Sequence, residues 1–296
     1  MSFSSAPEPT SEPRSQPAAR ADQIRNRVWL QGQYRSSANL SARATLHIRF
    51  RTNLYSWQRW VFDHIRAPHS ARILELGCGP GPLWIENYDR IPVGWRVWLT
   101  DLSPGMAEEA AQGLHTHIAD DGDRRLTFGQ DYAASVTDAQ VLPFTDGAFD
   151  VVVANHMLYH LGDVDACLGE VQRVLRKGGR FYAATNGRGH MRELHEFVRD
   201  FEPNLTLEHW GRNVFDLEQG LTKLPRYFSH VQLHSHPNAL HVTEPAPLAA
   251  YVLSGILDDS DPEYVARFRR YVIDHLATAG PLHITAQTGL FEAVKL

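Results

Sequence analysis

The segment Glu75-Leu-Gly-Cys-Gly-Pro-Gly81 is the clearest indication of the fold in this sequence. It follows Arg72–Leu76, a short apolar run that predicts a buried strand, and it precedes residues 82–90, which we expect to be helical. Glycines at such a junction let the backbone approach a ligand closely, and a helix N-terminus favours negative charge. The spacing G-x-G-x-G differs from the dinucleotide fingerprint G-x-G-x-x-G because Pro82 occupies the last glycine position. No G-K-[ST] follows, which excludes a P-loop.

Two further acidic residues end the next expected strands. Asp101 follows the strand predicted at Trp95–Thr100, and Asp138 follows the strand predicted at Ala133–Thr137. In α/β folds, an acid about 20 residues beyond the glycine loop accepts hydrogen bonds from ribose hydroxyls. An exocyclic adenine amine is the natural donor to Asp138. Glu75 would repel a pyrophosphate and suits a ligand with an ammonium group. The three strand ends therefore offer a glycine loop, a ribose-binding acid and an adenine-binding acid.

Strand and helix signals alternate between residues 71 and 186. Phe149–Ala154 is apolar on both faces, as in a covered parallel strand, Val164–Leu175 predicts an amphipathic helix, and Arg180–Thr185 predicts a fifth strand. We expect an α/β fold with a doubly wound, mostly parallel seven-stranded sheet. Beyond residue 186 the expected elements are helices at 191–201, 217–227, 247–255 and 262–279, short strands at 231–233 and 240–242, and one terminal strand at 283–295.

The chain is expected to have three regions. Residues 1–20 are rich in Ser, Pro and Ala and predict a disordered tail. Residues 21–70 predict an N-terminal helical cap, with a helix over 38–66 whose apolar face is formed by Leu54, Trp57, Val61 and Ile65. Residues 71–296 predict the ligand-binding domain, with a helical insertion near 186–230 on the substrate side. Ligands of such folds lie beyond the carboxyl ends of the strands, so we expect the cap to act as a lid.

Composition limits the class of protein. Apolar residues make up 43% and charged residues 21% of the 296 residues, which allows a sizeable core and argues against wholesale disorder. Two cysteines, Cys78 and Cys167, are too few for a disulfide scaffold or a Cys-rich zinc module. No apolar run approaches the roughly 18–20 residues of a membrane span, and the first twenty residues lack a signal-peptide core. We therefore expect a cytoplasmic protein.

Taken in order, these motifs resemble those of class I S-adenosylmethionine (SAM)-dependent methyltransferases, particularly the small-molecule group similar to ubiquinone/menaquinone C-methyltransferases. The resemblance covers about residues 70–186. It rests on ELGCGPG, TDLS around Asp101, DAQVLPF around Asp138, FDVVVANHMLYHL at 149–161 and LRKGGRFYAAT at 175–185. It implies SAM as the cofactor and a small molecule as the methyl acceptor.

The resemblance also implies the residues that hold the cofactor. It places the methionine and ribose moieties on the glycine loop and the adenine against the ends of the next two strands. The implied cofactor-binding residues are Glu75, Gly77, Cys78, Gly79, Gly81, Asp101, Leu102, Asp138, Ala139, Asn155 and His156. From the N-terminal segment, Tyr34 is our candidate for a contact with the SAM carboxylate or the acceptor.

His156 and His160 lie four residues apart, on one face of a turn. No H-E-x-x-H motif and no third ligand accompany them, so we predict no metal site and regard packing or polar lining as their alternative role. A sulfonium methyl is electrophilic, so the protein mainly has to align the acceptor and exclude water. A base is needed only where the acceptor loses a proton. His160 and then His156 are the candidate bases, and Tyr159 would orient the acceptor.

The distribution of charge bears on the acceptor. The net charge is −5, but residues 21–70 carry +6 and residues 71–296 carry −11. The acidic body argues against a nucleic-acid partner, while the basic segment leans toward an anionic small-molecule acceptor. Solvated helix faces, or a contact with the SAM carboxylate, would account for the same arginines, of which the candidates are Arg43, Arg49 and Arg51.

Two other functions remain open from the sequence. One is an RNA methyltransferase that uses the basic segment, although no Asn-Pro-Pro-Tyr-type motif is present. The other is a non-catalytic accessory protein with the same fold, although the cofactor motifs are intact. Outside these motifs, the pairs His115/His117 and His234/His236 are expected to be solvated.

Overall fold

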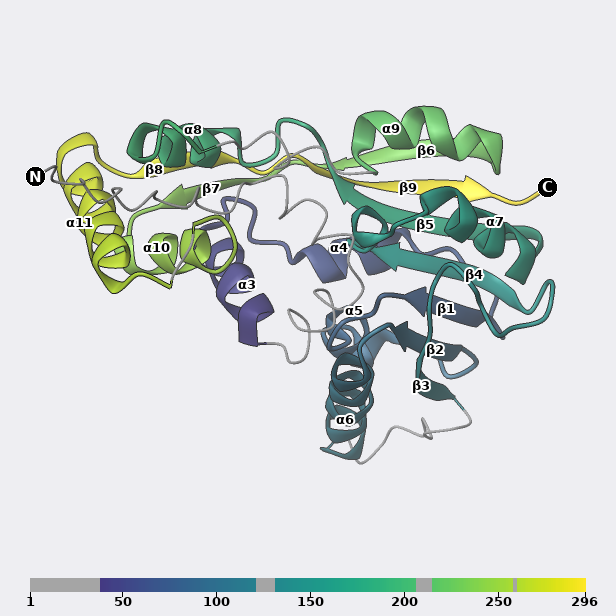
Figure 1. Cartoon of the computed structure of the whole chain (residues 1–296). Coiled ribbons are helices and arrows are strands. Elements are labelled where there is room, and N and C mark those ends of the chain that lie inside the picture. The colour runs from purple at the N-terminus through teal and green to yellow at the C-terminus, as the bar shows by residue number, and fades with distance from the viewer. Residues whose placement is uncertain (1–37, 121–130, 206–214, 258–259) are drawn as a thin grey trace, which may run out of the picture.

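The computed structural model of the chain describes residues 38–120, 131–205, 215–257 and 260–296 (Figure 1). The expected tail of residues 1–20 and Tyr34 lie outside these residues. A seven-stranded sheet has the order β3-β2-β1-β4-β5-β9-β6, in which β1 to β5 are parallel and β9 runs antiparallel to β5 and β6. Its strands are β1 (Arg72–Leu76), β2 (Arg96–Asp101), β3 (Tyr132–Val136), β4 (Phe149–Asn155), β5 (Leu175–Asn186), β6 (Ser229–His236) and β9 (Thr288–Val294). The predicted α/β class and doubly wound sheet are confirmed.

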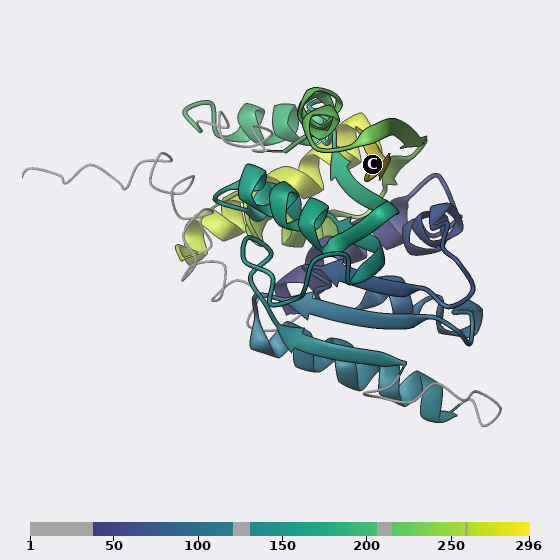
Figure 2. The ribbon, with the colours of Figure 1, turned by 90° about the vertical axis from the view of Figure 1, so that its right-hand side faces the viewer.

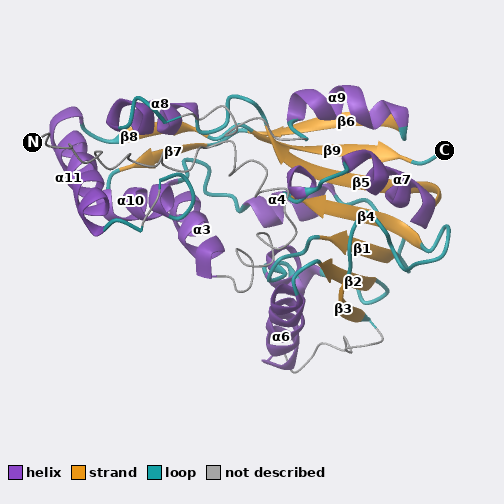
Figure 3. Ribbon diagram, viewed as in Figure 1, coloured by secondary structure: helices purple, strands orange, loops and turns teal. Residues whose placement is uncertain are grey.

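Helices cover both faces of this sheet (Figure 3). One face packs against α4 (Trp57–His64), α5 (Pro82–Ile85) and α6 (Pro104–Asp120), and the other against α7 (Val164–Val174) and α9 (Leu217–Lys223). Short turns of 3-10 helix follow at η1 (Tyr88–Arg90), η2 (Leu158–His160) and η3 (Leu224–Arg226).

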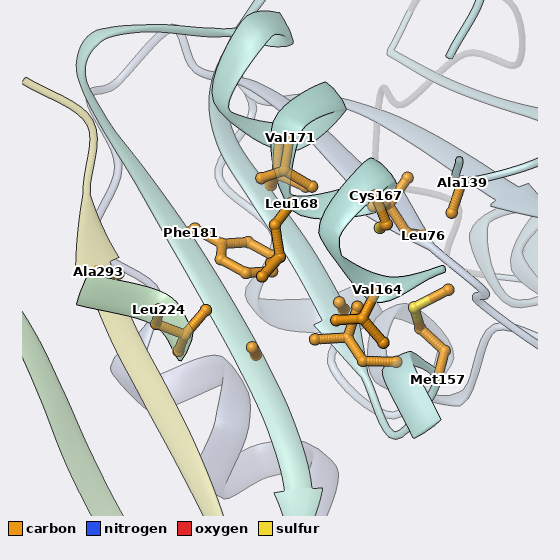
Figure 4. Packing of buried hydrophobic residues seen from close by; sticks show 14 of the residues in the cluster. Leu76, Ala139, Met157, Val164, Cys167, Leu168, Val171, Phe181, Leu224 and Ala293 are labelled. Atoms are coloured by element: carbon orange, nitrogen blue, oxygen red, sulfur yellow. The ribbon is translucent and has the colours of Figure 1, made fainter. Parts of the chain in front are cut away.

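Alternation along the central strands explains the two layers. In β4, Val151 and Val153 belong to the cluster around Trp84, whereas Val152 and Ala154 belong to the cluster on the other face. On that second face, Val164, Leu168 and Val171 of α7 pack against Phe181 of β5 (Figure 4). A strand that is buried on both faces must be apolar throughout, which is why FDVVVA carries no exposed alternation.

A third hydrophobic core lies beyond the carboxyl ends of the parallel strands (Figures 1 and 2). We call this lobe the cap; it includes much more of the chain than the N-terminal cap expected over residues 21–70. It combines α3 (Ala38–Phe50), α8 (Arg192–Phe201), α10 (Pro245–Leu253) and α11 (Pro262–Ala279) with the antiparallel pair β7 (Ala239–Val242) and β8 (Leu282–Thr285). Its fully buried residues include Leu46, Leu194, Leu240, Val252 and Phe268. The cap is therefore assembled from three separate stretches of the chain.

The continuous helix expected over residues 38–66 is wrong. The chain leaves the helix at Phe50, and α4 begins only at Trp57. Between them, the amide of Thr52 donates to the carbonyl of Ala239 (2.8 Å), and Leu54 is 82% exposed. Backbone pairing with the cap thus overrides the helical periodicity, so α3 belongs to the cap and α4 packs on the sheet.

Two other expected elements are divided by the tertiary structure. The single terminal strand at 283–295 is wrong, because β8 ends at Thr285 and pairs with β7, whereas β9 starts at Thr288 and pairs with β5 and β6. The helix expected at 82–90 shortens to α5 followed by η1. The local sequence of each segment favoured the expected element. It did not show with which distant segments the two parts of that element would pack.

Two helical glycines provide a matched test of the packing. A Cβ on Gly220 of α9 would lie 2.3 Å from Cε2 of the buried Phe291, whereas a Cβ on Gly169 of α7 would meet nothing within 4 Å. We expect Gly220→Ala to lower the free energy of unfolding by about 1–3 kcal/mol through overpacking. Gly169→Ala should raise it by about 0.5–1 kcal/mol through helix propensity. Urea unfolding measures both, and equal effects would contradict the packing of α9 on β9.

Candidate cofactor and acceptor site

The glycine loop adopts a backbone that other residues rarely tolerate. Gly77, Gly79 and Gly81 all have positive φ, at 59°, 55° and 79°. A Cβ on Gly77 would lie 2.6 Å from Cβ of Met157, so this position also requires the absence of a side chain. Gly81 caps α5, and the amide of Cys78 donates to the carbonyl of Thr100 in β2 (2.9 Å). The loop therefore presents bare backbone at the carboxyl end of β1.

The Cys78 side chain lies beneath this loop. It is 4% exposed, and burial raises the pKa of its thiol well above the ordinary value. The thiol donates to the carbonyl of Gly79 (3.3 Å). A buried, protonated thiol packs as a small apolar group, which agrees with a filling role in the loop.

Asp101 joins the glycine loop to β2. One oxygen of its half-buried carboxylate accepts from the amide of Gly79 (2.9 Å), and the other accepts from the amide of Ser103 (2.8 Å). Burial raises the pKa of Asp101, while the backbone amides act in the opposite direction. Each carboxylate oxygen can accept a further hydrogen bond, so the group is both a structural link and an acceptor for a ligand.

Glu75 lies beneath the loop and is 2% exposed. Its Oε2 accepts from Nε1 of Trp84 in α5 (2.7 Å). Burial, together with the negative charge of Asp101, raises the pKa of Glu75 to about 8. The carboxyl group is therefore mostly protonated at neutral pH, and a cation bound above it would favour ionisation.

Asp138 and Ala139 follow β3 in a loop that side chains hold from within. The amide and Nε2 of Gln140 both donate to Oδ1 of Asp138, at 3.0 and 3.1 Å. Arg173 of α7 donates to the carbonyl of Leu142 (3.0 Å), farther along the same loop. Ala139 is buried in the core, so the loop is fixed at the expected adenine end of the site.

Asn155 ends β4 and His156 follows it, next to α4. Oδ1 of Asn155 accepts from Nε1 of Trp57 (3.0 Å), and its Nδ2 donates to Oε1 of Gln58 (2.9 Å). His156 has a φ of 59°, which is uncommon outside glycine, and its amide donates to the carbonyl of Ala184 (3.1 Å). The amide group of Asn155 is thus engaged by α4, while the turn at His156 directs the chain toward η2.

The three candidate catalytic residues are brought together by this turn. The ring of Tyr159 lies 4.5 Å from that of His160 and 6.2 Å from that of His156, between ring centroids. Burial and the charges of His47 and His160 lower the pKa of His156 to about 4. His156 is therefore neutral at pH 7 and accepts a proton only when negative charge develops beside it.

Comparison with known proteins identifies the central segment. Residues 74–183 match the family model described as Methyltransferase domain. This segment has the fold of the class I methyltransferase domain, and we call it the methyltransferase domain. Over 124 residues the chain is 36% identical to malonyl-[acyl-carrier protein] O-methyltransferase of Geobacter sulfurreducens, which covers 42% of this chain and 42% of that protein. Over 125 residues it is 31% identical to the ubiquinone/menaquinone biosynthesis C-methyltransferase UbiE of Stenotrophomonas maltophilia, covering 42% of this chain and 46% of that protein.

Solved structures share the fold of the methyltransferase domain. The [4+2]-cyclase SpnF has a TM-score of 0.55 at 19% identity, covering 91% of this chain and 97% of that chain. YcgJ from Bacillus subtilis has a TM-score of 0.53 at 16% identity, covering 80% and 97%. The chain matches less than half the length of the two curated relatives.

Several residues beside the methyltransferase domain were not predicted from the sequence. The ring of His47 in α3 stacks on that of His190, which follows β5, with centroids 5.9 Å apart and planes 5° apart. Trp57 lies 5.0 Å from His156 and 5.2 Å from His236. His236 is buried, so its expected solvation is wrong. Packing of α3 and α4 against the ends of distant strands assembles these contacts, and no local motif signals them.

The arginines that the sequence analysis linked to an anionic acceptor are partly engaged elsewhere in the structure. Arg49 pairs with Glu244 of the cap (2.8 Å), so its charge is already matched there, and Arg51 pairs with Leu240 of β7 through the backbone. The side chain of Arg43 lies outside the described part. Within the described ranges, no three His, Cys, Asp or Glu side chains gather as a metal site, and no helix is long and apolar enough to cross a membrane.

The raised pKa of Glu75 predicts a pH-dependent stability. Its unfolded pKa is near 4.5 and its folded pKa is about 8, so its contribution is complete below pH 4.5 and is lost as the pH rises through 8. We expect the free energy of unfolding of the wild type to fall relative to that of Glu75→Gln as the pH rises from 5 to 9. Urea unfolding at several pH values measures this difference. The histidines are the same in both proteins, so their effect on stability cancels in the comparison. A constant difference would contradict a neutral, buried Glu75.

Proposed function

We propose that the protein transfers the methyl group of SAM to a small-molecule acceptor. The observation that carries the proposal is the link between Asp101 and the left-handed Gly77–Gly81 loop, inside the methyltransferase domain. The chemistry of the site fits SAM. The Asp101 carboxylate suits ribose hydroxyls, Asp138 suits the adenine amine, and the acidic surroundings of Glu75 suit a cationic sulfonium and ammonium.

The residues of the chain then have binding and positioning roles. SAM supplies an electrophilic methyl group when bound. The glycine loop, Asp101 and Asp138 would fix its orientation, and the cap would shield the carboxyl ends of the strands from water. His160, or His156, would take the proton from an acceptor that has to lose one, and Tyr159 would orient that acceptor. The low pKa of His156, about 4, makes it the weaker base toward a neutral acceptor.

The proposal is tested by measuring methyl transfer itself, because this fold is also that of a cyclase. The protein is incubated with SAM and a panel of small molecules, and S-adenosylhomocysteine is quantified. Formation above the rate without acceptor supports the proposal. SAM binding without any turnover would instead indicate an accessory protein, and turnover only with RNA would indicate a nucleic-acid substrate.

A charge-removing variant tests the ribose assignment. Asp101→Asn keeps the size of the side chain but removes the charge that strengthens each hydrogen bond, so we expect SAM affinity to fall by about tenfold or more. Calorimetric titration measures this affinity. Asp146→Asn is the control, because Asp146 is exposed and pairs with Arg173 away from the glycine loop (2.9 Å). Equal SAM affinities for the two variants would refute the role of Asp101.

The candidate base has its own test. For an acceptor that loses a proton, we expect His160→Asn to reduce kcat about 10²-fold or more while SAM affinity stays unchanged. His156→Asn should have the smaller effect, because the His156 imidazole binds protons weakly. Rates of S-adenosylhomocysteine formation between pH 6 and 9 distinguish the two. Unchanged rates in both variants would leave positioning as the only catalytic contribution.

A further inference from the structure

Two buried polar atoms beside the candidate acceptor site lack hydrogen-bond partners. They are Oδ1 of Asn186, at the end of β5, and Nδ1 of His190, in the turn that follows, and neither has a partner in the structure as described. A buried polar atom without a partner costs free energy, so such atoms are rare unless a ligand or water completes them. Their position therefore shows where a ligand has something to bind.

Both residues lie near His156, at the carboxyl ends of β4 and β5. Along β5, Tyr182 and Ala184 pack on the α4 face of the sheet, and strand alternation places Asn186 on that same face. The carbonyl of Ala184 already accepts the amide of His156 (3.1 Å), so Asn186 lies one step farther toward the cap. His190 stacks on His47 of the cap. The two unpaired atoms thus face the junction between the cap and the sheet.

The surroundings of this junction are neutral. Burial lowers the pKa of His47 and His156 to about 4 and that of His190 well below its ordinary value. The charged groups that act on His156 and His190 are themselves histidines: His47, His156, His160 and His195. Among the residues described, no carboxylate and no arginine contributes to these shifts. An ionised acceptor would therefore lose its hydration without gaining a countercharge.

We propose that Asn186 and His190 recognise the acceptor and select an uncharged molecule that donates a hydrogen bond. This inference rests on the proposed function, whose acceptor it specifies. Oδ1 of Asn186 can only accept, so the ligand has to bring an O–H or N–H group. Nδ1 of His190 offers one more hydrogen bond. The neighbouring rings of His47 and Tyr251, whose centroids lie 6.0 Å apart, suit a flat, apolar body. The acceptor is thus not the anion that the arginines of the sequence favoured.

Three probes with the same ring separate the contributions of the donor and the charge. Benzyl alcohol is neutral and donates, toluene is neutral and does not donate, and benzoate is charged and does not donate. Each is titrated at pH 7.5 onto the full chain, with and without S-adenosylhomocysteine, while the histidine ring resonances are followed by NMR. We expect benzyl alcohol to shift His190 and to bind about tenfold or more tightly than the other two. Benzoate binding as tightly as benzyl alcohol would overturn the proposal.

Variants assign the binding to the two residues. Asn186→Leu removes the acceptor, and His190→Phe keeps a ring that can stack on His47 but removes both nitrogens. Each should weaken benzyl alcohol about tenfold without changing toluene binding. The control is His241→Phe, which alters an exposed ring pair with His283 elsewhere in the cap. Unchanged benzyl alcohol affinity in both Asn186→Leu and His190→Phe would refute the assignment.

The same titrations keep this inference distinct from the proposed function. Calorimetry with S-adenosylhomocysteine tests the cofactor site alone. Loss of that binding in the wild type would contradict the proposed function, while the selectivity between the three probes would still decide the role of Asn186 and His190. In the variants, unchanged S-adenosylhomocysteine affinity shows that the fold is retained.

Discussion

The two amide hydrogen bonds to the Asp101 carboxylate are the interaction on which the rest of the site depends. They hold the glycine loop after β1 against the first turn after β2, at 2.9 Å from Gly79 and 2.8 Å from Ser103. Neighbouring parallel strands bring their carboxyl ends to one edge of the sheet. The hydrogen bonds to Asp101 then fix the positions of the loops that follow these strands relative to each other. Because the loop then has no freedom to collapse, its backbone stays open to a ligand.

The two halves of the site differ in their electrostatics. On the side of the glycine loop, Asp101 and Asp138 supply carboxylates, and the buried Glu75 beneath the loop can ionise beside a cation. Burial shifts the pKa of Glu75 to about 8, so the negative charge there increases when a cation arrives. On the side of the cap, buried imidazoles remain neutral. This division suits a reaction between a cationic methyl donor and an uncharged acceptor. The acidic side stabilises the cation, and the neutral side accommodates the uncharged molecule.

The cap explains why so few acceptor-side residues are visible in the sequence. His47 comes from α3, His190 from the turn after β5 and Tyr251 from α10, and their rings meet at the junction with the sheet. No local spacing relates these three positions. The pattern that was visible, a helical periodicity running through Leu54, failed because pairing of residues 51–53 with the cap interrupts the helix.

The motifs of the sequence predicted the parallel strands and the positions of the glycine loop, Asp101 and Asp138 at the ends of these strands. Each of these depends on contacts close along the chain: a buried strand, a glycine turn and an acid at the next strand end. The structure therefore has Gly77, Asp101 and Asp138 where the motifs predicted them. The tertiary structure alone brings His190 onto His47, divides residues 283–295 between two sheets and buries His236. These features depend on which distant segments pair with each other. The free energy of that pairing comes from apolar surface buried between two segments, which the hydrophobic pattern of one segment does not reveal.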